Sequence, residues 1–305
     1  MNLKDLKYFV TVAELKHFGK AAEACFVSQP TLSMQLKKLE ESLGVPLLER
    51  QPRTVLLTAA GRLVLPMARE ILRLSEDIRK TAVRLRDPGQ GEFHLGAFPT
   101  LAPYLFPHLV PDLRRRYPDL RLYLVEEKTE TLIGQLEIGR LDAALLAEPV
   151  DHPQFDHACL FEEAFLLAVP VTHPLAGRRQ VRAEDLQAEA LLLLTEGHCL
   201  RDQALEFCSM SGTRERDEFR ATSLETLRQM VASGMGITLL PWLTVQPPVQ
   251  NPPELALVPF EAPQPSRRIG LYWRRQSPFG EWMQALAGHM RDSAAALGLQ
   301  CDPSP

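Results

Sequence analysis

Two cysteines, Cys199 and Cys208, stand nine residues apart directly after an apolar run, 191–194, which we expect to be a strand. Cys199 is then expected at the start of a helix, where the dipole and unpaired backbone N–H groups favour a thiolate. His198 and Arg201 can add positive charge. A thiolate attacks peroxide to give a sulfenic acid, which a second thiol can capture as a disulfide.

The spacing of these two cysteines opposes a disulfide within one intact helix. Nine residues separate them by about 13.5 Å along the axis and place them on opposite sides, whereas a disulfide requires Cα atoms within about 7 Å. The segment between them must therefore melt or refold, which would turn oxidation into a conformational change. The alternative is that Cys208, beside Phe207, is an inert buried thiol and Cys199 an ordinary loop residue.

The other three cysteines suggest no disulfide framework, because five is an odd number and the positions are scattered. The number and positions of the cysteines indicate a protein of a reducing compartment. We expect Cys25 to pack in a helix and Cys301 to lie in a mobile tail. The segment from His157 to Cys159 lacks a second pair at metal-ligand spacing, so neither a metal nor a cofactor is expected.

The ends and the charge of the chain indicate a cytoplasmic protein with no membrane partner. The start lacks the apolar stretch of a secretory signal, and no run approaches the roughly 18 to 20 apolar residues that span a bilayer. The net charge of −4 hides an asymmetry, since residues 1–90 carry 15 Lys and Arg against 10 Asp and Glu. A basic N-terminal segment on an otherwise acidic chain suits a polyanion as the partner of that segment.

The first 90 residues are expected to be helical, with a wing. Apolar spacing predicts a first helix from Leu3, a second from Phe18 to about Phe26, and a third that Ser28 caps. Residues 48–57 place β-branched residues around a proline turn, which predicts a two-stranded wing.

The third helix has a face suited to DNA. Leu32, Leu36, Leu39 and Leu43 share the opposite face, which must be buried. Short hydroxyl and amide side chains near the helix start can reach base edges in the major groove, while lysines and wing arginines meet the backbone or minor groove. An ordinary solvated helix face is the alternative. The candidate DNA-binding residues are Gln29, Pro30, Thr31, Ser33, Gln35, Lys37, Lys38, Arg50 and Arg53.

A long helix is predicted from Thr58 to about Arg86. Pro66 fits poorly inside it and predicts a kink or a late start. Apolar residues spaced alternately by four and three predict a coiled-coil-like seam for a partner helix, and packing on the helix's own domain is the alternative. The seam consists of Met67, Ile71, Leu74, Ile78, Ala82 and Leu85.

After residue 91 the pattern changes to strands that alternate with helices. This βαβ rhythm predicts a parallel sheet with helices on both faces, in two lobes between which the chain crosses near residues 162 and 267. The expected class is α/β with an all-α N-terminal part. We expect a DNA-binding domain over 1–58, a dimerisation helix over 59–88, and a regulatory domain over 89–305, with lobe I at 89–162 and 267–305 and lobe II at 163–266.

The run Phe18-Gly-Lys-Ala-Ala-Glu-Ala-Cys-Phe-Val-Ser-Gln-Pro-Thr-Leu-Ser33, continuing through 39–50 and 57–61, closely resembles the LysR-type transcriptional regulators. The resemblance covers the whole chain and the order of its parts. It implies a winged helix-turn-helix, a linker helix that dimerises, a two-lobed fold like the periplasmic binding proteins, and a tetramer built as a dimer of dimers. Promoter DNA and RNA polymerase are the partners that it implies.

Within that family, segments 99–108, 197–208 and 221–228 look like the hydrogen-peroxide sensors, which regulate oxidative-stress genes. The likeness makes Cys199 the peroxidatic cysteine and Cys208 the resolving one, with a thiol reductant to reset them. The pocket that it implies follows the carboxyl ends of predicted strands, where open α/β sheets bind ligands. Its candidate residues are Thr100, Thr129, His198, Arg201 and Arg267, and Arg268 stands beside the last of them.

Two other functions compete with peroxide sensing. A LysR-type regulator whose cleft binds a small organic effector would leave the cysteines incidental. A thiol peroxidase would turn over peroxide with an external reductant, but the DNA-reading domain would then have no use. We therefore expect a regulator and not an enzyme.

Overall fold

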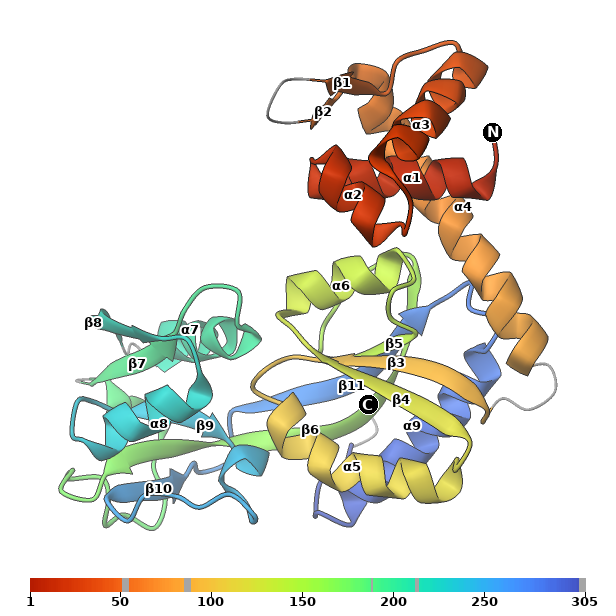
Figure 1. The fold of residues 1–305 in the computed structure, drawn as a ribbon. Coiled ribbons are helices and arrows are strands. Elements are labelled where there is room, and N and C mark those ends of the chain that lie inside the picture. The colour runs from red at the N-terminus through yellow and green to blue at the C-terminus, as the bar shows by residue number, and fades with distance from the viewer. Residues whose placement is uncertain (51–54, 85–88, 188, 212–213, 302–305) are drawn as a thin grey trace. The chain divides into compact units, whose positions relative to one another are not determined.

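The computed structural model describes residues 1–50, 55–84, 89–187, 189–211 and 214–301, and the chain divides into two compact units, 1–86 and 87–305 (Figure 1). Each unit has its own hydrophobic core. Within these ranges no helix combines the length and the apolar character needed to cross a membrane.

The first unit contains α1 (Leu3–Leu15), α2 (Phe18–Ala24) and α3 (Gln29–Leu43), followed by the antiparallel pair β1 (Leu48–Arg50) and β2 (Val55–Leu57), which confirms the wing. The cap at Ser28 is also confirmed, because its hydroxyl accepts the Thr31 N–H at 3.3 Å. Leu32, Leu36 and Leu39 are buried. The expected burial of Leu43 is wrong: it is the last residue of α3, and its side chain is 37% exposed.

Helix α4 (Ala59–Arg84) begins before Pro66 and continues past it, so a late start at that proline is wrong. Pro66 is the eighth residue of α4, so it lies beyond the first turn, and its missing N–H removes one backbone hydrogen bond from the helix. Met67, Ile71, Leu74 and Ile78 are each at least 40% exposed. They form an uncovered apolar stripe of the kind that a partner helix covers.

The second unit is built on a sheet with the strand order β10-β6-β11-β5-β3-β4. Strand β3 (Gly91–Ala97) is parallel to its neighbours β4 (Leu120–Glu126) and β5 (Ala143–Ala147), but β11 (Ser266–Arg274) is antiparallel to β5 and β6 (Phe155–Pro170). The expected parallel sheet is therefore confirmed for β3, β4 and β5, but it is wrong for β6 and β11. Strand β6 leads out of one lobe and β11 leads back, so the two run in opposite directions.

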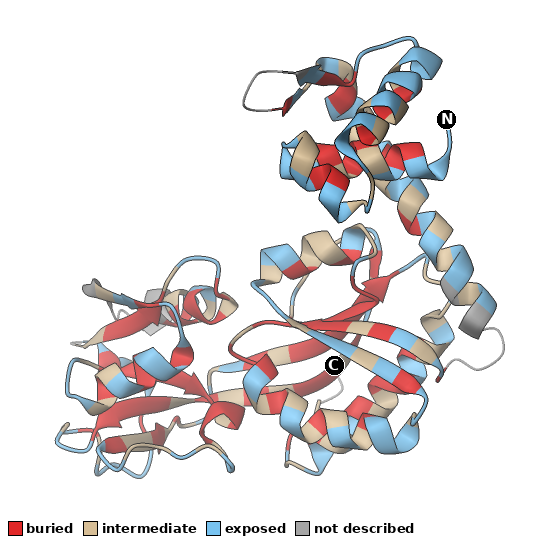
Figure 2. Cartoon of the chain, in the orientation of Figure 1, coloured by how far each residue is buried: buried red, intermediate tan, exposed pale blue. Residues whose placement is uncertain are grey.

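Two separate cores lie along β6. Phe161 belongs to the first, with β3, β4, β5 and the helices α5 (Ala102–Arg116), α6 (Thr129–Glu137) and α9 (Gly280–Ala295). Phe165 belongs to the second, with β7 (Ala190–Leu194), β8 (Arg214–Ala221), β9 (Thr238–Pro241), β10 (Leu255–Pro259), α7 (Cys199–Ser211) and α8 (Leu224–Ala232). Figure 2 shows most strands of both lobes as buried, whereas β4 is largely exposed or intermediate. We call them lobe I and lobe II.

The C-terminal segment corrects two expectations about the cysteines. Cys159 on β6 and Cys301 are joined by a disulfide, with Cα atoms 6.6 Å apart. Leu299, two residues before Cys301, is buried in the core of lobe I. A mobile tail and an absence of disulfides are therefore wrong for these residues. The sequence concealed the pairing because 142 positions separate the two cysteines.

Gly96 on β3 lets α6 pack closely on the sheet, and so places the start of α6. A Cβ at Gly96 would lie 2.6 Å from Leu132 and 2.7 Å from Leu141, so Gly96→Ala is expected to lower the free energy of unfolding by about 1–3 kcal/mol. Gly134→Ala, on α6 with open space around it, is the matched control and should raise it by roughly 0.5–1 kcal/mol. Denaturant unfolding measures both, and equal effects would contradict this packing.

Candidate functional site

Three predicted site residues come together at the carboxyl ends of strands. Thr100 follows β3, Thr129 is the first residue of α6 after β4, and Cys199 is the first residue of α7 after β7. The hydroxyls of Thr100 and Thr129 both reach the Cys199 thiol. Thr100, Lys128 and His198 also line an adjoining cavity of about 480 Å³ between the lobes, together with Ser223 and Glu225.

Arg267 holds this arrangement together from β11. Its guanidinium donates to the Thr100 hydroxyl and to the Thr100 carbonyl, both at 3.0 Å. Its Nε donates to a carboxylate oxygen of Glu163 at 2.7 Å, and both side chains are fully buried. Arg268 points elsewhere, toward Glu148 at 3.2 Å, as neighbours along a strand do. Arg267 is therefore the arginine of this pocket.

Glu163 was missed in the sequence. Its second carboxylate oxygen accepts the N–H of Leu243 at 3.0 Å, so this one side chain links β6 to the segment that follows β9 and neutralises Arg267. A buried charge of this kind needs such a partner because desolvation is costly. The available signal was the pair Glu162-Glu163, which interrupts the apolar run from residue 158 to residue 170.

The Cys199 thiol is free, and its environment raises its pKa above the ordinary value, because burial disfavours the thiolate. The positive charge of Arg267, the Thr129 hydroxyl, the N–H of Leu200 and the Thr100 hydroxyl all act in the opposite direction. The helix start does favour the thiolate, as expected, but burial outweighs it. Reactivity at this thiol must therefore depend on groups that bind the oxidant as well as on acidity.

Neither of the two expected sources of positive charge, His198 and Arg201, acts on the Cys199 thiol. Burial, with a contribution from the charge of Lys128, lowers the pKa of His198, so this imidazole is neutral at pH 7. Arg201 is buried and donates from Nη1 to the carbonyl of Leu194 at the end of β7. The cation that acts on the thiol is Arg267.

Two buried polar atoms beside the thiol have unused hydrogen-bonding capacity. Within the described ranges, His198 Nδ1 has no hydrogen-bond partner, and the Thr129 hydroxyl has none apart from the thiol. Unsatisfied buried groups are costly and are rare in folded proteins. Each of these groups is able to bond to a small polar ligand with donors and acceptors, such as a peroxide or water.

The loop before Cys199 is fixed from lobe I. Gly197 has a φ of +83°, in the region that favours glycine, and a Cβ there would lie 3.1 Å from Lys128. The Lys128 ammonium donates to the carbonyl of Glu196 at 2.8 Å. The loop that carries the thiol is thus attached to the segment that carries Thr129.

The candidate DNA-binding residues of α3 lie opposite its buried leucines. The exposed members are Gln29, Pro30, Lys37 and Lys38, whereas Thr31, Ser33 and Gln35 are partly buried. Lys37 also lies 3.8 Å from Glu41 in an exposed pair. Arg53 and the side chains of Arg50 and Cys208 lie outside the described part of the chain, so their roles stay predictions.

Comparison with known proteins agrees with both units. Residues 3–62 match the family described as bacterial regulatory helix-turn-helix protein, lysR family, and residues 86–295 match the LysR substrate binding domain. The chain belongs to the LysR family. Among its relatives, the DNA-binding transcriptional dual regulator OxyR of Escherichia coli K12 is 47% identical over 95% of each chain. The hydrogen peroxide-inducible genes activator of Haemophilus influenzae is 41% identical over 97% of this chain and 98% of its own.

Solved structures of OxyR proteins have the same fold as this LysR-family chain. A full-length OxyR variant of Pseudomonas aeruginosa matches with a TM-score of 0.75 and 39% identity, covering 95% of this chain and 98% of that one. A mutant OxyR of Corynebacterium glutamicum, described as bound to H₂O₂, matches with a TM-score of 0.65 and 34% identity, covering 99% and 97%.

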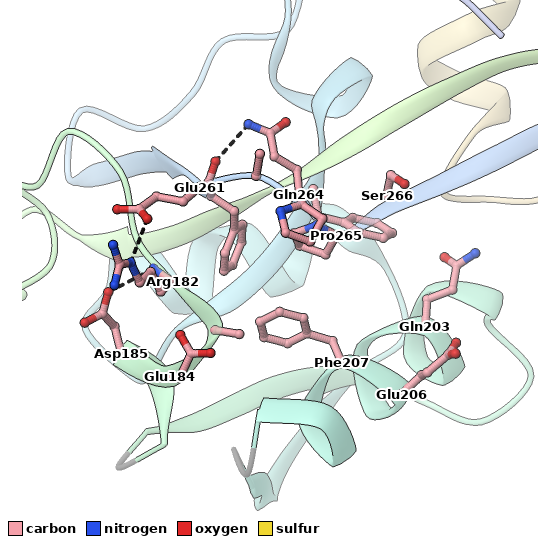
Figure 3. A pocket seen from close by; sticks show the side chains of 15 residues that line it. Arg182, Glu184, Asp185, Gln203, Glu206, Phe207, Glu261, Gln264, Pro265 and Ser266 are labelled. Atoms are coloured by element: carbon pink, nitrogen blue, oxygen red, sulfur yellow. Dashed lines mark hydrogen bonds and ion pairs between the residues drawn. The ribbon is translucent and has the colours of Figure 1, made fainter. Parts of the chain in front are cut away.

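Another cavity in this LysR-family chain lies against α7, in lobe II (Figure 3). It has a volume of about 950 Å³, and α7 contributes Gln203, Glu206 and Phe207 to its wall. The Phe207 ring meets the Phe260 ring edge to face, with centroids 5.3 Å apart. This aromatic pair attaches the middle of α7 to the chain after β10.

The pH dependence of Cys199 oxidation follows from its raised pKa. The thiolate fraction keeps growing through the neutral and mildly alkaline range, so the rate constant with hydrogen peroxide should rise about tenfold per pH unit between about pH 7 and 8.5. Stopped-flow measurement on a chain with Cys25→Ser isolates this thiol from the other free one described. A rate that levels off below about pH 8 would contradict the raised pKa.

Proposed function

We propose that this LysR-family chain is a transcription regulator that senses hydrogen peroxide through Cys199 and passes the signal to promoter DNA. The observation that carries the proposal is the Cys199 thiol held against Thr100, Thr129 and Arg267, with unsatisfied buried polar atoms beside it. The identities with OxyR proteins from several bacteria support it.

In the first step the Cys199 thiolate attacks one oxygen of hydrogen peroxide, and the O–O bond breaks. The sulfur becomes a sulfenic acid and the other oxygen leaves as hydroxide, which takes a proton to become water. In this proposal Arg267 and the hydroxyls of Thr100 and Thr129 hold the peroxide oxygens and stabilise the departing hydroxide. The neutral imidazole of His198 can donate or accept a hydrogen bond there.

In the second step the Cys208 thiol attacks the Cys199 sulfur, forms the disulfide and releases water. Both residues belong to the continuous helix α7, which sets them about 13.5 Å apart along the axis. Because disulfide formation requires Cα atoms within about 7 Å, α7 has to lose its helical turns. A thiol reductant would return the pair to two thiols and allow α7 to re-form.

The output of this switch is expected at α3 and the wing. The polar face of α3 would lie in the major groove, and the apolar stripe on α4 would pair with a second copy of the chain. A dimer of dimers, contact with RNA polymerase and control of oxidative-stress genes are the further consequences that we infer from membership of this family.

Substitution of each cysteine separates the two steps. With equimolar hydrogen peroxide, Cys208→Ser should stop at a sulfenic acid on Cys199, which dimedone traps, whereas Cys199→Ser should lose no thiol from this pair. The footprint on promoter DNA should change on oxidation only when both cysteines are present. Peptide mapping and footprinting on the same samples measure these outcomes.

Two results would overturn the proposal. An unchanged response in Cys199→Ser would favour a small organic effector in the cleft. Many peroxide turnovers per chain with an added reductant would favour a peroxidase.

Weaker attachment of α7 should speed the second step and leave the first unchanged. Phe207→Leu removes an aromatic pair of about 0.5–1.5 kcal/mol, so conversion of the sulfenic acid to the disulfide should accelerate roughly twofold to tenfold. Phe155→Leu, at another buried phenylalanine that belongs to lobe I, is the matched control. Rapid acid quench and mass spectrometry follow both species, and equal acceleration in the two variants would refute a specific role of α7.

A further inference from the structure

A second pair of cysteines lies outside the site described above. Cys159 on β6 and Cys301 after α9 form a disulfide, and both residues are half-buried, within reach of a small solute. Neither residue contributes to the Cys199 pocket. The pair belongs to lobe I, because its neighbours Ala158, Leu160 and Leu299 lie in the core of that lobe.

Non-covalent contacts hold Cys301 beside β6 independently of the disulfide. Gly298 adopts a φ of +83° at the end of α9, which turns the chain back. Leu299 then packs into the core of lobe I, and the carbonyl of Gln300 accepts the N–H of Glu162 at 2.8 Å. Reduction would therefore leave the two sulfurs as near neighbours, ready to bond again.

The electrostatic setting of the two sulfurs differs. Nη2 of Arg268 lies 3.7 Å from the Cys301 sulfur. A guanidinium at this distance stabilises a thiolate, so Cys301 is the better leaving group of the pair. An incoming thiolate is then directed to the sulfur of Cys159.

We propose that Cys159 and Cys301 form a second redox-active site, which exchanges with low-molecular-weight thiols and their disulfides independently of the peroxide chemistry at Cys199. A small thiolate RS⁻ attacks Cys159, the protein disulfide breaks, and Cys301 leaves as a thiolate that takes up a proton. A second RS⁻ attacks the sulfur of the bound R group, which releases RSSR and the Cys159 thiolate. Two RSH are thus oxidised as one protein disulfide is reduced, and the reverse sequence closes the bond.

The test uses full-length chain with Cys25→Ser, Cys199→Ser and Cys208→Ser, which keeps only this pair. Equilibration in buffers of reduced and oxidised glutathione, followed by acid quench, alkylation and mass spectrometry, should show one two-electron transition that ends in a linked Cys159–Cys301 peptide. Because the bond closes a loop of 142 residues, the oxidised form should melt at least about 5 °C higher. With Cys301→Ser added, glutathione should remain attached at Cys159.

Arg268→Gln tests the direction of attack, because loss of the guanidinium should slow reduction by glutathione about fivefold or more. Arg291→Gln, which removes an exposed contact to the Cys159 carbonyl, is the matched control and should leave the rate unchanged. Two free thiols in fully oxidised glutathione would overturn the proposal, as would a bond that resists reduced glutathione at every ratio. Mapping the linked Cys159–Cys301 peptide of the unsubstituted chain in the same glutathione buffers tests the proposal without the serine substitutions.

Discussion

The regular geometry of α7 is the constraint on which the proposed switch depends. As long as its backbone hydrogen bonds persist, Cys199 and Cys208 stay about 13.5 Å apart along the axis, far beyond the reach of a disulfide. Leu200, Ala204 and Phe207 attach the helix to the core of lobe II. Oxidation must therefore supply enough free energy to remove these side chains from their contacts, which couples chemistry at one sulfur to the shape of a whole lobe.

Arg267, Glu163 and Thr100 form the part of the site that we expect to remain fixed during the switch. Arg267 and Glu163 are fully buried, and their groups bond to one another, to Thr100 and to the N–H of Leu243. Breaking such a pair exposes an uncompensated charge to a medium that solvates it poorly, at a cost of about 3–5 kcal/mol. The oxidant would thus be held by a fixed frame from lobe I while the helix that carries the sulfur rearranges.

The parts of the fold that local patterns encode could be predicted, and the parts that depend on distant pairings could not. Helix spacing and Ser28 predicted α3 with its cap, and the proline turn predicted the wing. The direction of β11 depends on how the chain returns from lobe II, which no local pattern records. Glu163 lies on a strand far in sequence from Arg267, and Cys159 lies 142 positions from Cys301. At Cys199, charge was inferred from neighbours in sequence, whereas burial and Arg267 act through space.

Hydrogen exchange across α7 tests the central claim most directly, because it reports the backbone hydrogen bonds that keep the cysteines apart. Peptides covering residues 199–211 should be protected in the reduced chain and lose protection after hydrogen peroxide, while peptides from β3 and β11 keep theirs. Cys208→Ser oxidised to the sulfenic acid should remain protected. A chain that maps as fully linked between Cys199 and Cys208 with α7 still protected would contradict the proposed coupling.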